Sequence, residues 1–127
     1  MSNPRVGLVV THRRYVSYAD AHYAGELVDG AFCLGLFGDA ATEVCIRTDG
    51  DEGLFASYAE VQFLAPVRAG DLLEVRAEVA RVGTRSRTID FTATVVARGR
   101  PEVSASSAAM LDEPIVATTA TGTVVVP

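Results

Sequence analysis

The chain has 127 residues, of which 49% are hydrophobic and 21% are charged, and its formal net charge is −5 at pH 7. This composition is typical of a folded globular protein and excludes a disordered chain. The length favours a single domain spanning residues 1–127. The negative charge argues against nucleic acid or an anionic membrane as the main partner.

The start of the chain does not resemble a secretory signal peptide. Its apolar run "VGLVV" is short and continues directly into the charged "THRRY". The longest uninterrupted apolar run, residues 30–38, is too short to span a bilayer. Cys33 and Cys45 fall several turns apart on an expected helix, so we interpret them as buried apolar residues in a reducing compartment. We therefore expect a cytoplasmic protein.

The first predicted element is a strand within residues 5–18, where β-branched and aromatic residues are frequent. A polar, glycine-containing lead, "ADAHYAG", then introduces one long helix. This helix is predicted to begin near Gly25 or Glu26 and to end near Ile46 or Arg47. The segment "TDGDEG", residues 48–53, is a clear turn signal.

Four further strands are predicted after this turn, at residues 54–65, 71–83, 86–98 and 114–126, with a polar loop at residues 99–114. The second and third of these strands alternate hydrophobic and polar residues, as half-buried antiparallel strands do. The order of elements predicts an α+β fold in which a five-stranded antiparallel sheet wraps around one long central helix. Such a sheet has open edges, so we expect self-association.

Two carboxylates, Asp39 and Glu43, lie one turn apart on the predicted helix, which is apolar nearly all round. If both were buried, they would resist double ionisation, and the pKa of at least one would rise. Carboxylates tuned in this way can perform general acid–base catalysis. The alternative is that both face solvent, or pair with arginines from a neighbouring subunit.

His22 and Tyr23 come directly before the predicted helix. Backbone N–H groups around residues 24–26 would there point outward at the positive end of the helix dipole, where they can hold a carbonyl oxygen or a developing oxyanion. A neutral His22 could donate to the same oxygen, although a packing or capping role is equally open. His12 is interpreted as structural or exposed. No His, Cys, Asp or Glu grouping has convincing metal-ligand spacing, so no metal is expected.

Several arginines lie at or near strand connections. Each is interpreted as a surface charge, but together they are candidates for binding the phosphates of a nucleotide-bearing ligand. They are Arg68, Arg85 and Arg87, followed by Arg98 and Arg100.

Four motifs resemble those of the hotdog-fold family of β-alanyl-CoA and 3-aminobutyryl-CoA ammonia-lyases. They are "DAHYAGELVDGA" (20–31), "GDAATE" (38–43), "DGDEGLF" (49–55) and "TATGT" (119–123). A fifth motif, "FLAPVRAGD" (63–71), resembles the hotdog fold of acyl-CoA thioesterases and dehydratases more generally. The resemblance covers roughly residues 15–98 and 115–125 and leaves the polar loop unmatched.

This resemblance implies a homo-oligomer built from dimers, such as a hexamer, with active sites at the dimer interface. It implies coenzyme A thioesters as substrates and reversible loss of ammonia from a β-aminoacyl-CoA, with no cofactor beyond the CoA that is part of the substrate. Glu43 and Asp39 match the position of the family fold's catalytic carboxylate, and His22, Tyr23 and Gly25 match the position where the thioester carbonyl is held.

Our hypothesis assigns Glu43 as the base for the α-proton and Asp39 as the partner of the leaving ammonium, although the two roles could be exchanged. Amides near Gly25, with His22, would stabilise the enolate. The runner-up is an acyl-CoA thioesterase in which Glu43 or Asp39 activates water. An enoyl-CoA hydratase and a non-catalytic acyl-CoA binding subunit are the remaining alternatives.

Overall fold

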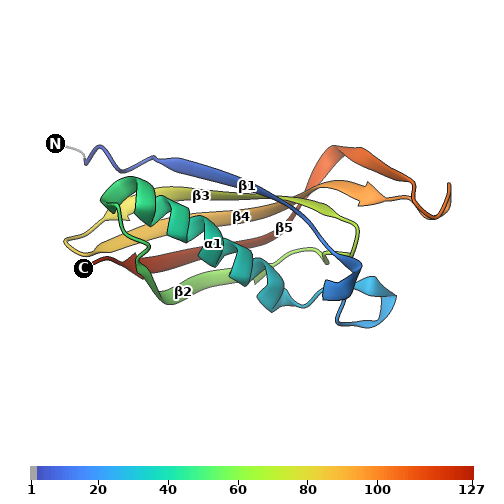
Figure 1. Cartoon of the computed structure of the whole chain (residues 1–127), viewed down its shortest axis with the longest axis horizontal. Helices are drawn as coiled ribbons and strands as arrows, with labels where there is room; N and C mark the ends of the chain where they lie inside the picture. The colour runs from blue at the N-terminus through green and yellow to red at the C-terminus, as the bar shows by residue number, and fades with distance from the viewer. Residues whose placement is uncertain (1–2) are drawn as a thin grey trace.

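The computed structural model describes residues 3–127 and places one long helix across one face of a five-stranded antiparallel sheet (Figure 1). The strand order is β1-β3-β4-β5-β2, so β1 and β2 form the two edges. This arrangement confirms the predicted fold class. The elements are β1 (Val9–Tyr15), α1 (Gly30–Asp49), β2 (Leu54–Phe63), β3 (Leu72–Val82), β4 (Ser86–Gly99) and β5 (Ala108–Val125).

The helix begins five residues later than the predicted Gly25, at Gly30. Gly25 and Glu26 have φ angles of 74° and 60°, which an α-helix does not accommodate, and they lie in a short 3₁₀ turn, Ala24–Glu26. Asp29 caps the true helix, because its carboxylate accepts a hydrogen bond from the Phe32 N–H at 3.1 Å. The helix ends at Asp49, beyond the predicted end, where Gly50 adopts a left-handed conformation.

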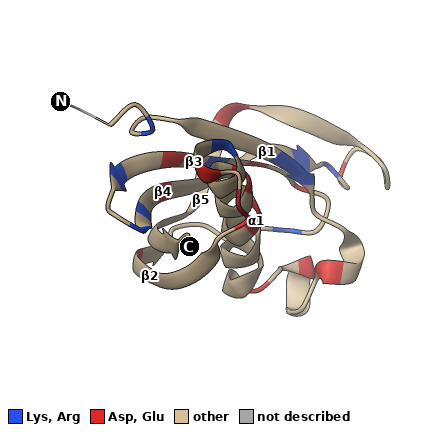
Figure 2. Cartoon of the chain, turned by 60° about the vertical axis from the view of Figure 1, so that its left-hand side comes forward, with Lys and Arg blue, Asp and Glu red and all other residues tan. Residues whose placement is uncertain are grey.

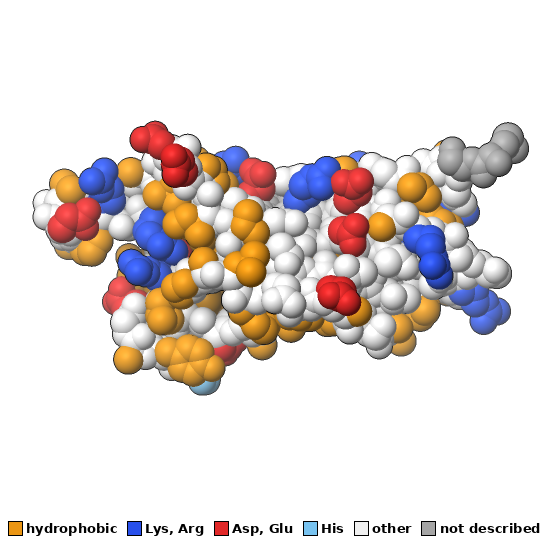
Figure 3. Space-filling model, turned by 180° about the vertical axis from the view of Figure 1, so that it is seen from behind, with side chains coloured by type: hydrophobic (Ala, Val, Ile, Leu, Met, Phe, Trp, Pro, Cys, Tyr) orange, Lys and Arg blue, Asp and Glu red, His pale blue; other side chains and the backbone are white. Residues whose placement is uncertain are grey.

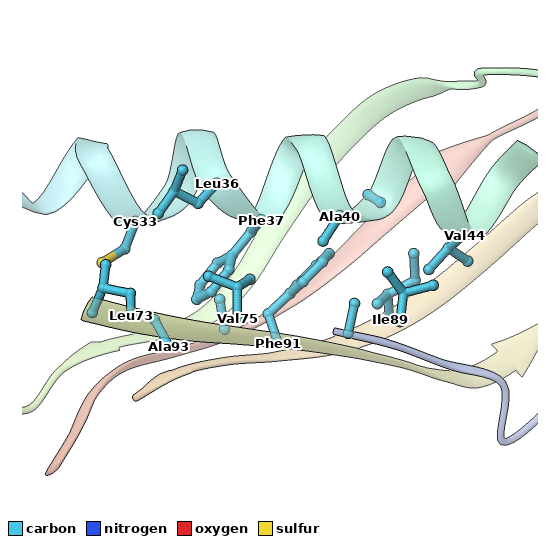
Figure 4. Close-up of a cluster of buried hydrophobic side chains, with 14 of the residues drawn as sticks. Cys33, Leu36, Phe37, Ala40, Val44, Leu73, Val75, Ile89, Phe91 and Ala93 are labelled. Atoms are coloured by element: carbon cyan, nitrogen blue, oxygen red, sulfur yellow. The ribbon is translucent and has the colours of Figure 1, made fainter. Parts of the chain in front are cut away.

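The core lies between α1 and the central strands. The alternation of β3 and β4 points one set of side chains at the helix, including Leu73, Val75, Ile89 and Phe91, as Figure 4 shows. From the helix, Phe37 stacks on Phe91 with ring centroids 4.9 Å apart. The free cysteines Cys33 and Cys45 are buried in the same core, as predicted.

The polar segment predicted as a loop is mostly a hairpin. β4 runs to Gly99 and β5 begins at Ala108, so only residues 100–107 form the connection. The Arg100 N–H donates to the Ser107 carbonyl oxygen at 2.7 Å and closes the turn. The hairpin projects beyond the helix (Figure 1), and most of its residues are exposed, so its sequence lacks the regular apolar alternation that signals a strand.

Gly122 of β5 lies directly beneath two aromatic rings. A Cβ atom at this position would come within 2.5 Å of Phe55 Cζ and 2.8 Å of Phe91 Cε2. We expect Gly122→Ala to lower the free energy of unfolding by about 1–3 kcal/mol, because the rings must leave their packed positions. Urea unfolding of the variant measures this loss. Gly99→Ala is the control, because its nearest contact would be 3.9 Å; equal losses in both variants would contradict the packing argument.

In the described part of the chain, no helix combines the length and the apolar character that crossing a membrane requires.

Candidate functional site

A hollow of about 350 Å³ opens at the N-terminal end of α1, between the helix and the segment that follows β2. Gly30 is suited to this position, because a Cβ atom there would lie 2.7 Å from Phe63 Cε1. The first amides of a helix lack intrahelical acceptors and carry the positive end of its dipole. The hollow is lined by Val28, Asp29, Gly30, Cys33, residues 63–67 and Thr118.

Asp29 and His22 lie together at this end of the helix. His22 Nδ1 is 3.8 Å from Asp29 Oδ2, and the exposed His22 ring meets the Tyr23 ring edge to face at 4.9 Å. The N–H groups of His22 and Tyr23 both donate to the Leu27 carbonyl oxygen, at 2.9 and 3.0 Å. Three predicted residues, His22, Tyr23 and Gly25, therefore share one tight loop. The predicted oxyanion amides around residues 24–26 do not begin the long helix; those of α1 begin at Gly30.

Glu43 lies further along the helix, where it contacts His12 of β1. Its two carboxylate oxygens accept hydrogen bonds from His12 Nε2 at 2.8 Å and from Arg47 Nε at 2.7 Å. These hydrogen bonds, the one from His12 first, lower the pKa of Glu43 below its ordinary value. Asp39 is exposed. The expected buried pair of carboxylates is therefore not present in the single chain, because Asp39 is exposed and Glu43 pairs with an arginine of its own helix.

The predicted catalytic set is not brought together within one chain. At a rise of 1.5 Å per residue, Asp39 lies about 13 Å and Glu43 about 20 Å from Gly30 along the axis of α1. In Figure 2, basic positions are seen on β1 and acidic ones on α1. The contact between His12 and Glu43 escaped the sequence analysis, because it depends on how α1 lies across the edge strand. The carboxylate that does lie at the hollow is Asp29, inside the motif "DAHYAGELVDGA".

The candidate arginines separate to opposite ends of the sheet. Arg68 is exposed after β2, in a cleft that also includes Gly25, whereas Arg85 lies at the turn between β3 and β4. Arg87 is only 2% exposed and donates to Asp49 Oδ2 at 3.0 Å and to Asp49 Oδ1 at 2.7 Å. It also donates to the carbonyl oxygens of Gly83 and Ser86. The guanidinium of Arg87 thus stabilises the fold through these buried hydrogen bonds, and it is not available to a ligand as predicted.

No three His, Cys, Asp or Glu side chains among the described residues are grouped so that they could hold a metal ion.

Comparisons with known proteins place these features in context. The family model of the thioesterase superfamily matches residues 29–102. The chain is 50% identical over 112 residues, 88% of its length and 89% of the relative's, to a 3-aminobutyryl-CoA ammonia lyase of Acetoanaerobium sticklandii.

Solved structures give a consistent picture. The β-alanyl-CoA:ammonia lyase of Clostridium propionicum superposes with a TM-score of 0.89 at 36% identity, covering 95% of this chain and 86% of that one. A hexameric thioesterase of Yersinia pestis superposes with a TM-score of 0.79 at 20% identity, covering 99% and 90%. The second similarity establishes the fold alone.

Proposed function

Because this chain belongs to the thioesterase superfamily and, within it, to the hotdog-fold family of the 3-aminobutyryl-CoA and β-alanyl-CoA ammonia lyases, we propose that it is a β-aminoacyl-CoA ammonia lyase. It reversibly eliminates ammonia from 3-aminobutyryl-CoA or β-alanyl-CoA to give an enoyl-CoA. The observation that carries this proposal is the 50% identity to a 3-aminobutyryl-CoA ammonia lyase over 88% of the chain.

The hollow at α1 offers the groups that this reaction requires. Elimination needs a base for the proton α to the thioester carbonyl and donors for the oxygen of the resulting enolate. We propose that the carbonyl oxygen lies at the first-turn amides of α1, where the helix dipole favours negative charge. Gly30 lines the hollow and leaves that end of the helix accessible.

The geometry favours Asp29 as the base. The α-carbon is bonded to the carbonyl carbon, so its base must lie next to the oxyanion donors, and Asp29 directly precedes Gly30. Glu43 lies about 20 Å further along the helix. Its role and that of Asp39 stay predictions, and both require a second copy to bring them to the hollow. His22, beside Asp29, would orient that carboxylate or donate to the thioester.

A second copy is proposed to pair along β2. This ten-residue edge strand has no neighbour on its outer side among the described residues. Leu54, Phe63 and Leu64 are 73%, 58% and 60% exposed at or beside it, whereas the edge strand β1 carries Arg13 and Arg14. Phe63 also lines the hollow, so pairing at β2 would cover the site. We propose a dimer or a dimer-based oligomer such as a hexamer.

Two further predictions complete the proposal. Acid–base residues and main-chain amides are sufficient for this elimination, so we propose no cofactor besides the CoA carried by the substrate. The buried, unpaired thiols of Cys33 and Cys45 fit the predicted cytoplasmic location, where thiols stay reduced.

The decisive experiment is a paired assay of the purified protein with crotonyl-CoA. With ammonium present, we expect loss of the enoyl absorbance and formation of 3-aminobutyryl-CoA, identified by mass. Without ammonium, we expect no release of free CoA thiol.

The same assay tests an acyl-CoA thioesterase, which the match to the thioesterase superfamily keeps as the second candidate. Thiol release without amination would replace the lyase by a hydrolase, in which a carboxylate at the hollow activates water.

A further inference from the structure

One polar side chain of β5 points into the core at the hollow. Directly paired residues of antiparallel strands share a face of the sheet, and Thr118 pairs with the buried Ala93 of β4. The same inward row continues as Ala120, Gly122 and Val124, so Thr118 is its polar member. Thr118 is only 3% exposed, and it lines the hollow at the N-terminal end of α1. A hydroxyl buried in this way requires hydrogen-bonding partners.

The partner that the fold provides is a thiol. Cys33 points from α1 toward the sheet, as Figure 4 shows, and forms a hydrogen bond with the Thr118 side chain. Burial raises the pKa of the Cys33 thiol, so the sulfur is a neutral and weak partner. Within residues 3–127, the Thr118 hydroxyl has no carbonyl, carboxylate or N–H partner. When the hydroxyl donates to the sulfur, its oxygen remains an acceptor for a ligand in the hollow.

The polar groups of the hollow lie at two levels along α1. Asp29 and the first amides of the helix form the outer level. Cys33 follows Gly30 by about 4.5 Å along the helix axis and, with Thr118, forms the inner level. The other side chains that line the hollow are apolar: Val28, Phe63, Leu64, Ala65, Pro66 and Val67.

These two levels suit a thioester that carries an amino group on its β-carbon. With the carbonyl oxygen at the first-turn amides, the α- and β-carbons span the apolar gap and bring the nitrogen to the inner level. The amino group is an ammonium at neutral pH, so its N–H groups need acceptors and a negative charge nearby. Thr118 supplies an oxygen and Asp29 a carboxylate. A saturated acyl chain would leave the hydroxyl without this hydrogen bond.

We infer that the Thr118 hydroxyl binds the β-amino group of the thioester, and the ammonia released from it, at the inner end of the hollow. This inference rests on the proposed function for the identity of the substrate and for the position of its carbonyl group. It makes Thr118 a substrate-binding residue that favours an amino group on the β-carbon over hydrogen or hydroxyl.

Equilibrium binding of unreactive thioethers tests this inference without catalysis. S-(3-aminobutyl)-CoA and S-butyl-CoA lack the carbonyl group, so their α-protons are not acidic and neither compound can undergo elimination. By calorimetry at neutral pH, we expect the full-length protein to bind the amino compound more tightly. Thr118→Val replaces the hydroxyl with a methyl group of similar size. It should lower the ratio of the two affinities about tenfold, because a hydrogen bond to a charged group is lost.

Three further variants control for changes in packing. Thr118→Ser retains the hydroxyl and should retain the preference, whereas Thr118→Ala should lose it even if Thr118→Val does not fold. Thr119→Val is the matched control, because alternation along β5 places Thr119 on the outer face of the sheet, opposite Thr92. Figure 3 shows the middle of this outer face as neutral polar side chains and backbone, with acidic side chains among them.

Three results would each overturn the inference. They are an unchanged ratio of affinities in Thr118→Val or Thr118→Ala, an equal fall in Thr119→Val, and equal binding of S-(3-hydroxybutyl)-CoA and the amino compound by the unmodified protein. The last result would make the inner level a site for a hydroxyl group or water.

Steady-state kinetics separates this inference from the proposed function. In Thr118→Val, KM for ammonium should rise about tenfold while KM for crotonyl-CoA stays the same. If ammonia addition is observed but the thioether ratio is unchanged in the variant, the inference fails and the proposed function stands. If no ammonia addition is observed, the proposed function fails. A preference for the amino thioether that depends on the Thr118 hydroxyl would still support the site.

Discussion

Asp29→Asn is expected to lower kcat/KM for ammonia addition to crotonyl-CoA by about 100-fold to 10,000-fold, the contribution of a positioned acid–base group. Asparagine caps a helix about as well as aspartate does, so it can accept the hydrogen bond from the Phe32 N–H and preserve the start of α1. The variant then differs mainly in having lost an ionisable group at the hollow. Circular dichroism and steady-state kinetics on the same sample measure both properties.

Glu43→Gln provides the comparison, because it removes a carboxylate about 20 Å along the same helix. We expect it to retain much more activity than Asp29→Asn, since Glu43 is already bound by His12 and Arg47. If Glu43→Gln is inactive and Asp29→Asn retains near-normal turnover, the assignment of Asp29 is wrong. Glu43, supplied by a second copy, would then be the base. Equal, severe losses would give the two carboxylates the separate roles of α-proton base and ammonium partner.

Asp49→Ala is expected to lower the free energy of unfolding by about 3–5 kcal/mol, because it strands the charge of the buried Arg87. Arg87 is 2% exposed, and two of its hydrogen bonds go to the Asp49 carboxylate. Arg5 also donates to Asp49, at 2.9 Å, so the same residue ties the start of the chain to the end of α1. Chemical denaturation at pH 7 measures the loss.

The pH dependence of stability offers a second readout of this ion pair. The hydrogen bond from Arg87 is the main reason why the pKa of Asp49 lies below its ordinary value. The stabilisation is therefore present above the unfolded-state pKa of about 3.9 and is lost as the pH falls through the lower folded-state value. In Asp49→Ala, the free energy of unfolding should therefore fall less steeply as the pH is lowered through the acidic range.

A double variant, Asp49→Leu with Arg87→Met, serves as the control. Replacing both charges with apolar side chains should recover most of the stability, because no buried charge is left unpaired. A loss in Asp49→Ala of less than about 0.5 kcal/mol, the range of ordinary surface substitutions, would contradict the importance of the pair.

The sheet could be predicted because hydrophobic and polar residues alternate along its central strands. Leu73, Val75, Ala77 and Val79 alternate with polar residues, and the structure buries all four. The helix start was misplaced because the left-handed conformations of Gly25 and Glu26 leave no signal in an apolar pattern. The sequence did contain a better marker. Asp29 before Gly30 is an N-cap signal, and it marks both the helix start and the carboxylate at the hollow.

The site was less predictable, because its residues meet only through tertiary packing. The role of Arg87 could have been predicted from the alternation of side chains along the strand. Arg87, Ile89 and Phe91 share the inward face of β4, and an arginine on that face must have a buried partner. The pairing of Arg98 with Asp71 could not be predicted from the sequence, because it depends on the position of the β2–β3 connection beside β4. The contact of His12 with Glu43 likewise joins an edge strand to a distant helix turn.

The position of β5 between β4 and β2 has a consequence for how the chain folds. β4 and β5 are consecutive and can form a hairpin early, but β2 must pair with β5 across most of the chain, with Leu54 beside Val125. Such distant pairings cost loop-closure entropy before they add stability, so they slow folding. The other edge strand, β1, pairs over a similar separation, with Val9 beside Glu78 of β3. Both edge strands are thus expected to consolidate last, and the hollow beside the end of β2 with them. A ligand that binds there selects molecules that have completed this final step.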